Sequence, residues 1–222
     1  MKSTKTTYEQ AKSPMKSTKK VFFLFAAIVL VVLAACSDKQ DYIPSYAVDL
    51  VEVNTNSQSK IDNVRLDDGQ VYSVHQSISA STPDTTLRCL VTYSVADANM
   101  TIYSAKEVFS KHPLPATLFK SRPTDPVRFI SCWRSDRYLN IKIGVLTTGV
   151  GTHQFHFAED SISQNAAGKR TAHFTLLHRR PDDDAESYTD ERFLSVPLAN
   201  YSRCDSFAIT INTYDGPLVE QR

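Results

Sequence analysis

Short segments rich in β-branched and aromatic residues alternate with turn-forming residues from residue 47 onward. Segments of this kind predict β-strands, and a chain made mainly of them needs an all-β fold. The clearest case is 138–145, where Leu139, Ile141, Ile143 and Val145 alternate with Asn140, Lys142 and Gly144. This period of two predicts a strand with one buried face and one face in water. The segments predicted as strands are 47–53, 61–66, 71–74, 87–95, 100–108, 127–133, 138–145, 153–158, 170–179, 192–197 and 207–214. Only 104–111 and the stretch after Glu159 leave room for a helical turn.

Four prolines interrupt this series between residues 112 and 126. Proline fixes φ and removes a backbone donor, so a regular strand ladder is not expected to pass through this segment. The prediction is therefore two small β domains, at 46–111 and 127–222, joined by a Pro-rich linker at 112–126.

The N-terminus predicts an export signal. Six lysines and one glutamate precede residue 21, and an unbroken apolar run follows from Val21 to Ala35. A bilayer-spanning helix needs about 20 apolar residues, so this run is too short to remain as a span. Leu33, Ala34 and Ala35 stand directly before Cys36, which predicts a signal peptide at 1–35 that is cleaved before the cysteine. A second Met-Lys-Ser-Thr-Lys at Met15 leaves open whether translation starts there or at Met1.

The segment Leu33-Ala34-Ala35-Cys36 resembles a bacterial lipobox, in which the thiol of the final cysteine receives covalent lipid. Two or more acyl chains make membrane attachment stable. We expect lipid on Cys36, no other cofactor, and a short polar tether at 36–45. The expected location is the cell envelope, most simply the outer membrane, with the periplasmic and surface faces both open.

The charge of the mature chain argues against nucleic-acid binding. Removing residues 1–35 takes away six lysines and one glutamate, which changes the net charge from +1 to about −4. A nucleic-acid surface needs a basic face that displaces counterions from phosphates. Three cysteines then remain besides Cys36, and an odd number cannot all pair. We expect Cys89 to be a buried free thiol and leave open whether Cys132 and Cys204 form a disulfide.

Several short segments give the chain a resemblance to the NigD-like lipoproteins, exported proteins of Gram-negative gut anaerobes. They are the lipobox, Val64-Arg65-Leu66-Asp67-Asp68-Gly69, Asp125-Pro126-Val127, Trp133 followed by Tyr138-Leu139-Asn140-Ile141, and Tyr214-Asp215-Gly216. The resemblance implies an N-terminal OB-like β-barrel and a C-terminal immunoglobulin-like β-sandwich. Its name implies a bacteriocin-immunity role, and it supplies no catalytic residues. Cys132-Trp133 does not reproduce the Cys, Trp, Cys spacing of antibody domains.

The sequence contains no strong signature of a metal site or an enzyme. His153 with His156, and His173 with His178, are three and five residues apart, so in a strand each pair points to opposite faces. The acidic run 182–186 lacks the spacing of calcium loops and is expected to be a solvated hairpin tip. There is no Gly-x-Ser-x-Gly and no phosphate loop. We therefore predict no metal site and no catalytic residues.

Four aromatic residues are candidates for ligand contact: Tyr72 and Tyr93 in the first domain, Trp133 and Tyr138 in the second. OB folds bind oligosaccharides on one sheet face, and aromatic rings stack on such ligands. The alternative is that these rings fill the two cores. The leading functional hypothesis is a non-catalytic envelope lipoprotein that binds another protein; the rivals are an accessory oligosaccharide-binding lipoprotein and a hydrolase with an unrecognised site. Asp84-Thr85-Thr86 and Asp160-Ser161-Ile162 are candidate O-glycosylation sites.

Overall fold

The structure is a computed structural model that describes residues 45–76, 78–96, 99–182 and 187–222. The predicted signal peptide, Cys36, nearly all of the tether and most of the acidic run 182–186 lie outside these residues. Residues 44–222 belong to one compact unit. Within the described residues, no helix has the length and apolar character needed to cross a membrane.

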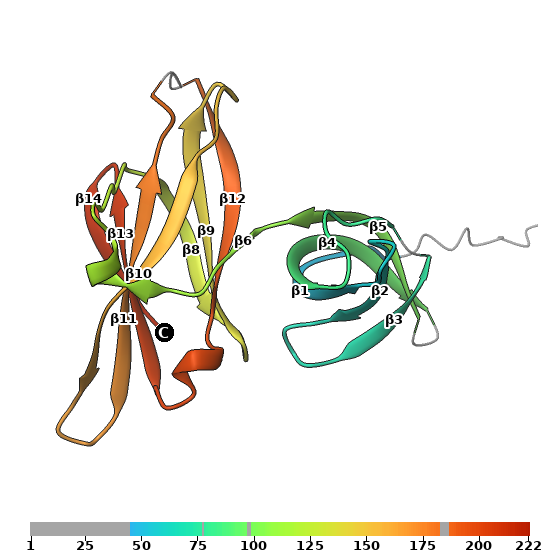
Figure 1. Cartoon of the computed structure of the whole chain (residues 1–222), viewed down its shortest axis with the longest axis horizontal. Helices are drawn as coiled ribbons and strands as arrows, with labels where there is room; N and C mark the ends of the chain where they lie inside the picture. The colour runs from blue at the N-terminus through green and yellow to red at the C-terminus, as the bar shows by residue number, and fades with distance from the viewer. Residues whose placement is uncertain (1–44, 77, 97–98, 183–186) are drawn as a thin grey trace, which may run out of the picture. The chain divides into compact units, whose positions relative to one another are not determined.

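The first domain is a closed five-stranded barrel (Figure 1) with the strand order β1-β2-β3-β5-β4. Strands β3 and β5 run parallel, and the other neighbours run antiparallel. This arrangement is the five-stranded OB fold that the resemblance implied. Its strands are β1 (Ala47–Thr55), β2 (Ile61–Arg65), β3 (Val71–Gln76), β4 (Thr86–Ala96) and β5 (Asn99–Glu107).

Alternating residues of these strands close the barrel core. The inward side chains of β1, β4 and β5 include Val51, Cys89, Val91, Met100 and Ile102, all nearly or fully buried. Their outward neighbours alternate with them, as the two-residue period of a strand requires. The core of this domain is therefore filled by the apolar residues that the pattern predicted.

The Asp67-Asp68-Gly69 segment forms the turn that connects β2 to β3. Gly69 takes φ +89°, a conformation that glycine adopts without steric cost. Its amide donates to the Leu66 carbonyl, and the Asp68 side chain accepts the amide of Gln70. These bonds leave the preceding residue, Asp67, free to turn its carboxylate away from the turn.

The second domain is a sandwich of two sheets, with strand orders β14-β13-β11-β10-β7 and β6-β12-β9-β8 (Figure 1). This confirms the predicted immunoglobulin-like β-sandwich. Its long strands are β8 (Arg128–Arg134), β9 (Tyr138–Thr147), β10 (Gln154–Gln164), β11 (Arg170–Arg179), β12 (Tyr188–Pro197), β13 (Ser206–Thr213) and β14 (Gly216–Gln221). Strand β14 follows the Tyr214-Asp215-Gly216 turn and was not predicted, because Pro217 and exposed Val219 weaken its pattern.

Short strands in and just before the Pro-rich segment join the sandwich, so residues 109–110 belong to the sandwich and not to the first domain. Strand β6 (Phe109–Ser110) pairs with β12, and β7 (Leu114–Pro115) pairs with β10, each over two residues. Further on, the Asp125 amide donates to the His178 carbonyl, and the Asp125 carboxylate accepts the amide of Arg180. The segment thus lies along the sheets, and its prolines limit each pairing to a few residues.

The predicted helical turns are wrong. Residues 104–107 continue strand β5, and the residues after Glu159 continue β10 to Gln164. Both strands contain a register shift, at Thr92/Tyr93 opposite β5 and at Glu159/Ser161 in β10. A bulge breaks the period of two, which explains why the alternation was not visible. In the described residues the helical turns are instead 3₁₀ turns, η1 (Ala116–Leu118) and η2 (Ala199–Tyr201).

The three cysteines in the described residues are free and buried. Cys89 lies in the barrel core, whereas Cys132 and Cys204 lie in the sandwich core without bonding to each other. Burial raises the pKa of the Cys89 and Cys132 thiols to about 11. Both therefore remain protonated at neutral pH and react slowly, because the thiolate is the nucleophile.

These thiols give a direct test of the core assignments. In protein carrying Cys36→Ser, we expect all three thiols to resist a water-soluble thiol reagent in the native state and all three to react after denaturation. Counting reacted thiols by mass spectrometry, with and without prior reduction, measures this. Only one reactive thiol in denatured, unreduced protein would mean that Cys132 and Cys204 form a disulfide.

Candidate binding site

The prediction that one face of β9 lies in water is only partly correct. The residues for which it fails belong to a cluster of buried polar side chains. Lys142 is partly exposed as expected, but Asn140 is fully buried. Tyr138, two residues earlier on the same face, is also buried. Side chains on the inner face of β9 fill the sandwich core, so Tyr138 and Asn140 must be covered from outside. The barrel covers them.

Arg88, on the outward face of β4, is the centre of this contact. Its side chain is 1% exposed and makes two bonds to the Asp67 carboxylate, from Nη1 at 2.7 Å and from Nη2 at 2.8 Å. A charged guanidinium loses much hydration energy when buried, and a bidentate carboxylate offsets that loss. Asp67 is brought into reach by the β2–β3 turn.

Residues of the sandwich accept two further hydrogen bonds from Arg88. Its Nη2 donates to Asn140 Oδ1 at 3.1 Å and its Nε to Ser195 Oγ at 3.4 Å. Ser195 Oγ donates to Asn140 Oδ1 at 2.7 Å, across the paired strands β12 and β9. The guanidinium carbon lies 4.1 Å from the ring centroid of Tyr138, a distance suited to a cation–π contact.

A second bond between the domains lies beside the first. Glu52 pairs with Arg88 in the register of β1 and β4. The hydroxyl of Tyr138 donates to Glu52 Oε1 at 2.6 Å, and Arg137 Nη1 lies 3.0 Å from Glu52 Oε2. Burial is the main cause that raises the pKa of Tyr138, and the hydrogen bond to Glu52 raises it further. The phenol therefore stays protonated and continues to donate at neutral pH.

We call this set the domain clamp. It consists of Glu52, Asp67, Arg88, Arg137, Tyr138, Asn140 and Ser195. Three of these, Asp67, Tyr138 and Asn140, belong to segments that carried the family resemblance. Those segments thus hold the barrel and the sandwich in one orientation.

A groove of about 480 Å³ lies next to the clamp and is lined by both domains. The barrel contributes Val48, Asp49, Leu50, Leu66, Asp67, Asp68, Leu90 and Tyr93, and the sandwich contributes Trp133 and Phe193. Apolar and aromatic side chains make up most of this lining, with three carboxylates among them. Clefts between domains are frequent ligand sites.

The structure brings together two of the four aromatic candidates, Tyr93 and Trp133. Tyr93 is only 6% exposed and its hydroxyl donates to Asp49 Oδ2 at 2.9 Å, while Trp133 is partly exposed and contacts Phe193 edge to face. Burial and the bond to Asp49 raise the pKa of Tyr93. Tyr138 lies in the clamp, and Tyr72 packs on the barrel core and donates to Gln70. Sequence reasoning missed Phe193, which has no distinguishing pattern within its strand.

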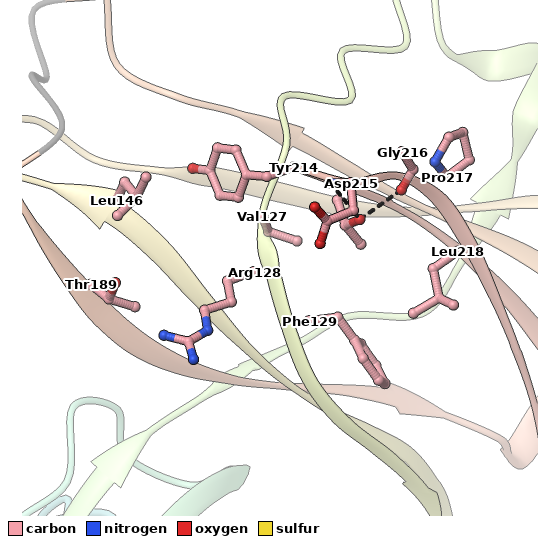
Figure 2. A pocket seen from close by; sticks show the side chains of 11 residues that line it. Val127, Arg128, Phe129, Leu146, Thr189, Tyr214, Asp215, Gly216, Pro217 and Leu218 are labelled. Carbon is pink, nitrogen blue, oxygen red and sulfur yellow. Dashed lines mark hydrogen bonds between the residues drawn. The ribbon is translucent and has the colours of Figure 1, made fainter.

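A larger hollow of about 680 Å³ lies between β8 and the β13–β14 hairpin (Figure 2). Val127, Arg128 and Phe129 line one side, and the Tyr214–Leu218 turn lines the other. Thr213 Oγ accepts the Asp215 amide and donates to the Gly216 carbonyl. With Gly216 at φ +108°, these bonds fix the turn. The Tyr214-Asp215-Gly216 segment is thus accounted for by the structure of the turn itself.

The histidines pair differently from the two combinations considered in the sequence. His153 Nδ1 lies 2.9 Å from His178 Nε2, and His178 Nδ1 lies 2.9 Å from the Asp125 carbonyl. Burial lowers the pKa of His178, so it is neutral at pH 7. Among the described residues, no group of three or more His, Cys, Asp or Glu side chains could hold a metal ion.

One serine lies within bonding distance of a histidine, Ser163 Oγ to His173 Nε2 at 2.8 Å. The two lie on the neighbouring strands β10 and β11 in an exposed position, although the residue paired with His173 in the register is Ser161. Neither lines the groove or the hollow described above. A nucleophilic serine also needs an orienting group for the histidine and donors for the oxyanion.

Comparisons with known proteins place the second domain in a family. Residues 114–218 match the family of NigD-like C-terminal beta sandwich domains. A crystal structure described as a NigD-like immunity protein from Bacteroides caccae is 26% identical, with TM-score 0.63, and the match covers 82% of this chain and 93% of that one. Residues 114–218 therefore form a NigD-like C-terminal beta sandwich domain, and the chain as a whole is similar to the B. caccae NigD-like protein in fold.

Two further solved structures share the NigD-like fold at lower identity. One, a protein of unknown function from Bacteroides vulgatus, is 17% identical with TM-score 0.63, covering 80% of this chain and 90% of that one. The other, described as a candidate lipoprotein from Bacteroides fragilis, is 10% identical with TM-score 0.59, covering 81% and 97%. No curated protein matches this chain. The barrel and the sandwich therefore recur together across these Bacteroides proteins.

The clamp predicts how this chain unfolds. Asp67→Ala leaves the Arg88 charge buried without its partner, which we expect to cost about 3 kcal/mol of unfolding free energy. It should also separate the single denaturant transition into two, one for each domain. Equilibrium unfolding followed by Trp133 fluorescence and by far-UV circular dichroism measures both effects.

The matched control is Glu191→Ala, which removes a carboxylate from an exposed pair with Lys142 and should cost less than about 1 kcal/mol. Replacing both partners, with Arg88→Met and Asp67→Leu, should recover much of the loss, because no charge is then left buried. Equal costs for Asp67→Ala and Glu191→Ala would contradict the clamp.

Proposed function

We propose that this chain is a lipid-anchored, non-catalytic protein of the bacterial cell envelope that binds a protein partner at the groove between its two domains. The observation that carries the proposal is the domain clamp. Two domains that act separately need no fixed orientation, whereas a binding surface built from both domains does. The clamp uses a buried ion pair and buried amide and hydroxyl groups for this purpose, at a desolvation cost that apolar packing would avoid.

The lining of the groove favours a protein as the partner. Leu50, Leu90 and Phe193 contribute apolar surface to its lining, while Asp49 and Asp68 contribute charge. Protein interfaces combine an aromatic or apolar centre with a polar rim. The B. caccae relative is described as an immunity protein, and for such a role the partner would be a toxin.

The non-catalytic part of the proposal rests on how the polar side chains of the clamp are used. Arg88, Asn140 and Ser195 bond to one another inside the contact between the domains. Groups satisfied in this way are held for structure, whereas a reacting group needs an open side toward its substrate.

The anchor is tested on the mature protein. We expect the N-terminal peptide of membrane-extracted protein to begin at Cys36 and to carry the added mass of acyl chains. Cys36→Ser should leave the signal uncut and remove the lipid mass. An unlipidated N-terminus in the native protein would refute the anchor while leaving the groove untouched.

The partner is tested by site-specific crosslinking in intact cells. A photoreactive amino acid at position 68, on the groove, should give a discrete adduct, and the same amino acid at exposed position 219 on β14 should not. Mass spectrometry of the adduct then distinguishes an envelope protein from a toxin.

The clamp supplies the internal control for this experiment. Asp67→Ala should reduce the position 68 adduct, because it frees the domains to move apart. Identical adducts from positions 68 and 219, or none from position 68, would contradict the proposal.

Oligosaccharide binding is the second candidate function, favoured by the placement of Tyr93 and Trp133 in one groove with carboxylates that accept sugar hydroxyls. The burial of Tyr93 leaves Trp133 as the ring most able to stack on a sugar. Retention on immobilised polysaccharides that Trp133→Ala abolishes would support this candidate over the protein partner.

A further inference from the structure

Exposed tyrosine and valine side chains lie together close to the start of the described chain. Tyr46 is 55% exposed, and its ring contacts that of Tyr103 edge to face, with centroids 4.7 Å apart. Tyr103 is itself 47% exposed, and Val48 is 58% exposed. Tyr46 directly precedes β1, on which Val48 is the second residue, and its ring contact with Tyr103 brings the two tyrosines onto one exposed surface.

The strand neighbours of these three residues carry hydroxyl groups, and the exposed Lys106 follows two residues after Ser104 on the same face of β5. Val48 pairs with Thr92 in the register of β1 and β4, and Ser104 pairs with Thr92 from β5. Ser104 Oγ donates to Thr92 Oγ1 at 3.1 Å, and Ser94 Oγ lies 2.9 Å from the Tyr103 hydroxyl. We call Tyr46, Val48, Thr92, Ser94, Tyr103 and Ser104 the tyrosine face. Val48 also lines the groove, so the two surfaces adjoin at this residue.

The tyrosine face differs from the other exposed apolar residues of the described chain. Its two aromatic rings are in contact and Val48 lies on the same outer surface of neighbouring strands, which makes one continuous patch. Contiguous exposed apolar surface on a folded protein marks a contact site, whereas single exposed residues do not.

The tyrosine face is close in sequence to Cys36, and this closeness indicates what the face binds. Only nine residues, 37–45, separate Cys36 from Tyr46, and fully extended they reach about 30 Å. Tyrosine is enriched at membrane interfaces, where its ring lies among apolar groups and its hydroxyl meets water and headgroups. None of the residues of the tyrosine face is charged, so the face also loses little hydration energy on entering that region.

We infer that the tyrosine face docks onto the headgroup region of the same bilayer that holds the lipid on Cys36. This inference rests on the proposed anchor. Docking turns the β1–β4–β5 side of the barrel toward the lipid. The lipid provides attachment, and the tyrosine face provides orientation.

Fluorescence quenching by the bilayer tests this docking. Tyr46→Trp places an indole within the tyrosine face, and Tyr188→Trp is the matched control, because Tyr188 is 52% exposed on β12 of the sandwich. The unsubstituted protein supplies the signal of Trp133 alone. The vesicles contain phosphatidylethanolamine and phosphatidylglycerol with acyl chains brominated close to the headgroup.

The experiment has two arms that separate the docking from the anchor. One arm uses the lipidated mature protein. The other uses residues 37–222 with an N-terminal histidine tag in place of Cys36, held on the same vesicles by a nickel-chelating lipid. If lipidated protein cannot be obtained, the proposed lipid anchor on Cys36 is contradicted. The second arm would still measure whether the tyrosine face docks onto the bilayer.

In both arms we expect Tyr46→Trp emission to shift to the blue and to be quenched several-fold more strongly than that of Tyr188→Trp. Adding Tyr103→Ser, which removes the ring next to position 46, should weaken the quenching. Equal quenching at positions 46 and 188 on nickel-tethered vesicles would overturn the docking and leave the anchor standing.

Discussion

The ion pair between Arg88 and Asp67 is the interaction on which the arrangement of this molecule depends. Arg88 lies on a barrel strand, and two of its bonding partners, Asn140 and Ser195, lie on sandwich strands. A buried guanidinium is stable only when its charge and its donors are satisfied together. That requirement is met only when the β2–β3 turn, β4, β9 and β12 are in their observed places, so one side chain links the geometry of both domains.

Much of the fold could be predicted from local patterns. The period of two in β9 and the Asp67-Asp68-Gly69 turn are short-range signals that tertiary packing left intact. The alternation of apolar and polar residues is interrupted in β5 and β10, because each contains a bulge. It did not predict β14, because that strand contains a proline and exposed apolar residues. The burial of Asn140 could not be predicted, because its cover comes from a residue 52 positions away in sequence.

Only part of the candidate site could be predicted from the sequence, for the same reason. Tyr93 and Trp133 could be named as aromatic residues, but nothing in the sequence indicates that they meet at one groove, since that depends on how the domains pack. Phe193 became visible only with the structure. The family segments contributed indirectly, because Asp67, Tyr138 and Asn140 build the contact that forms the groove without themselves resembling a binding motif.

The central claim is that the two domains keep one orientation. Pulsed electron spin resonance between labels at Val71→Cys on β3 and Val219→Cys on β14 measures it most directly, in protein carrying Cys36→Ser and with the buried native thiols left in place. A single narrow distance distribution that broadens on Asp67→Ala is the result we predict. A broad distribution in protein with an intact clamp would contradict the account.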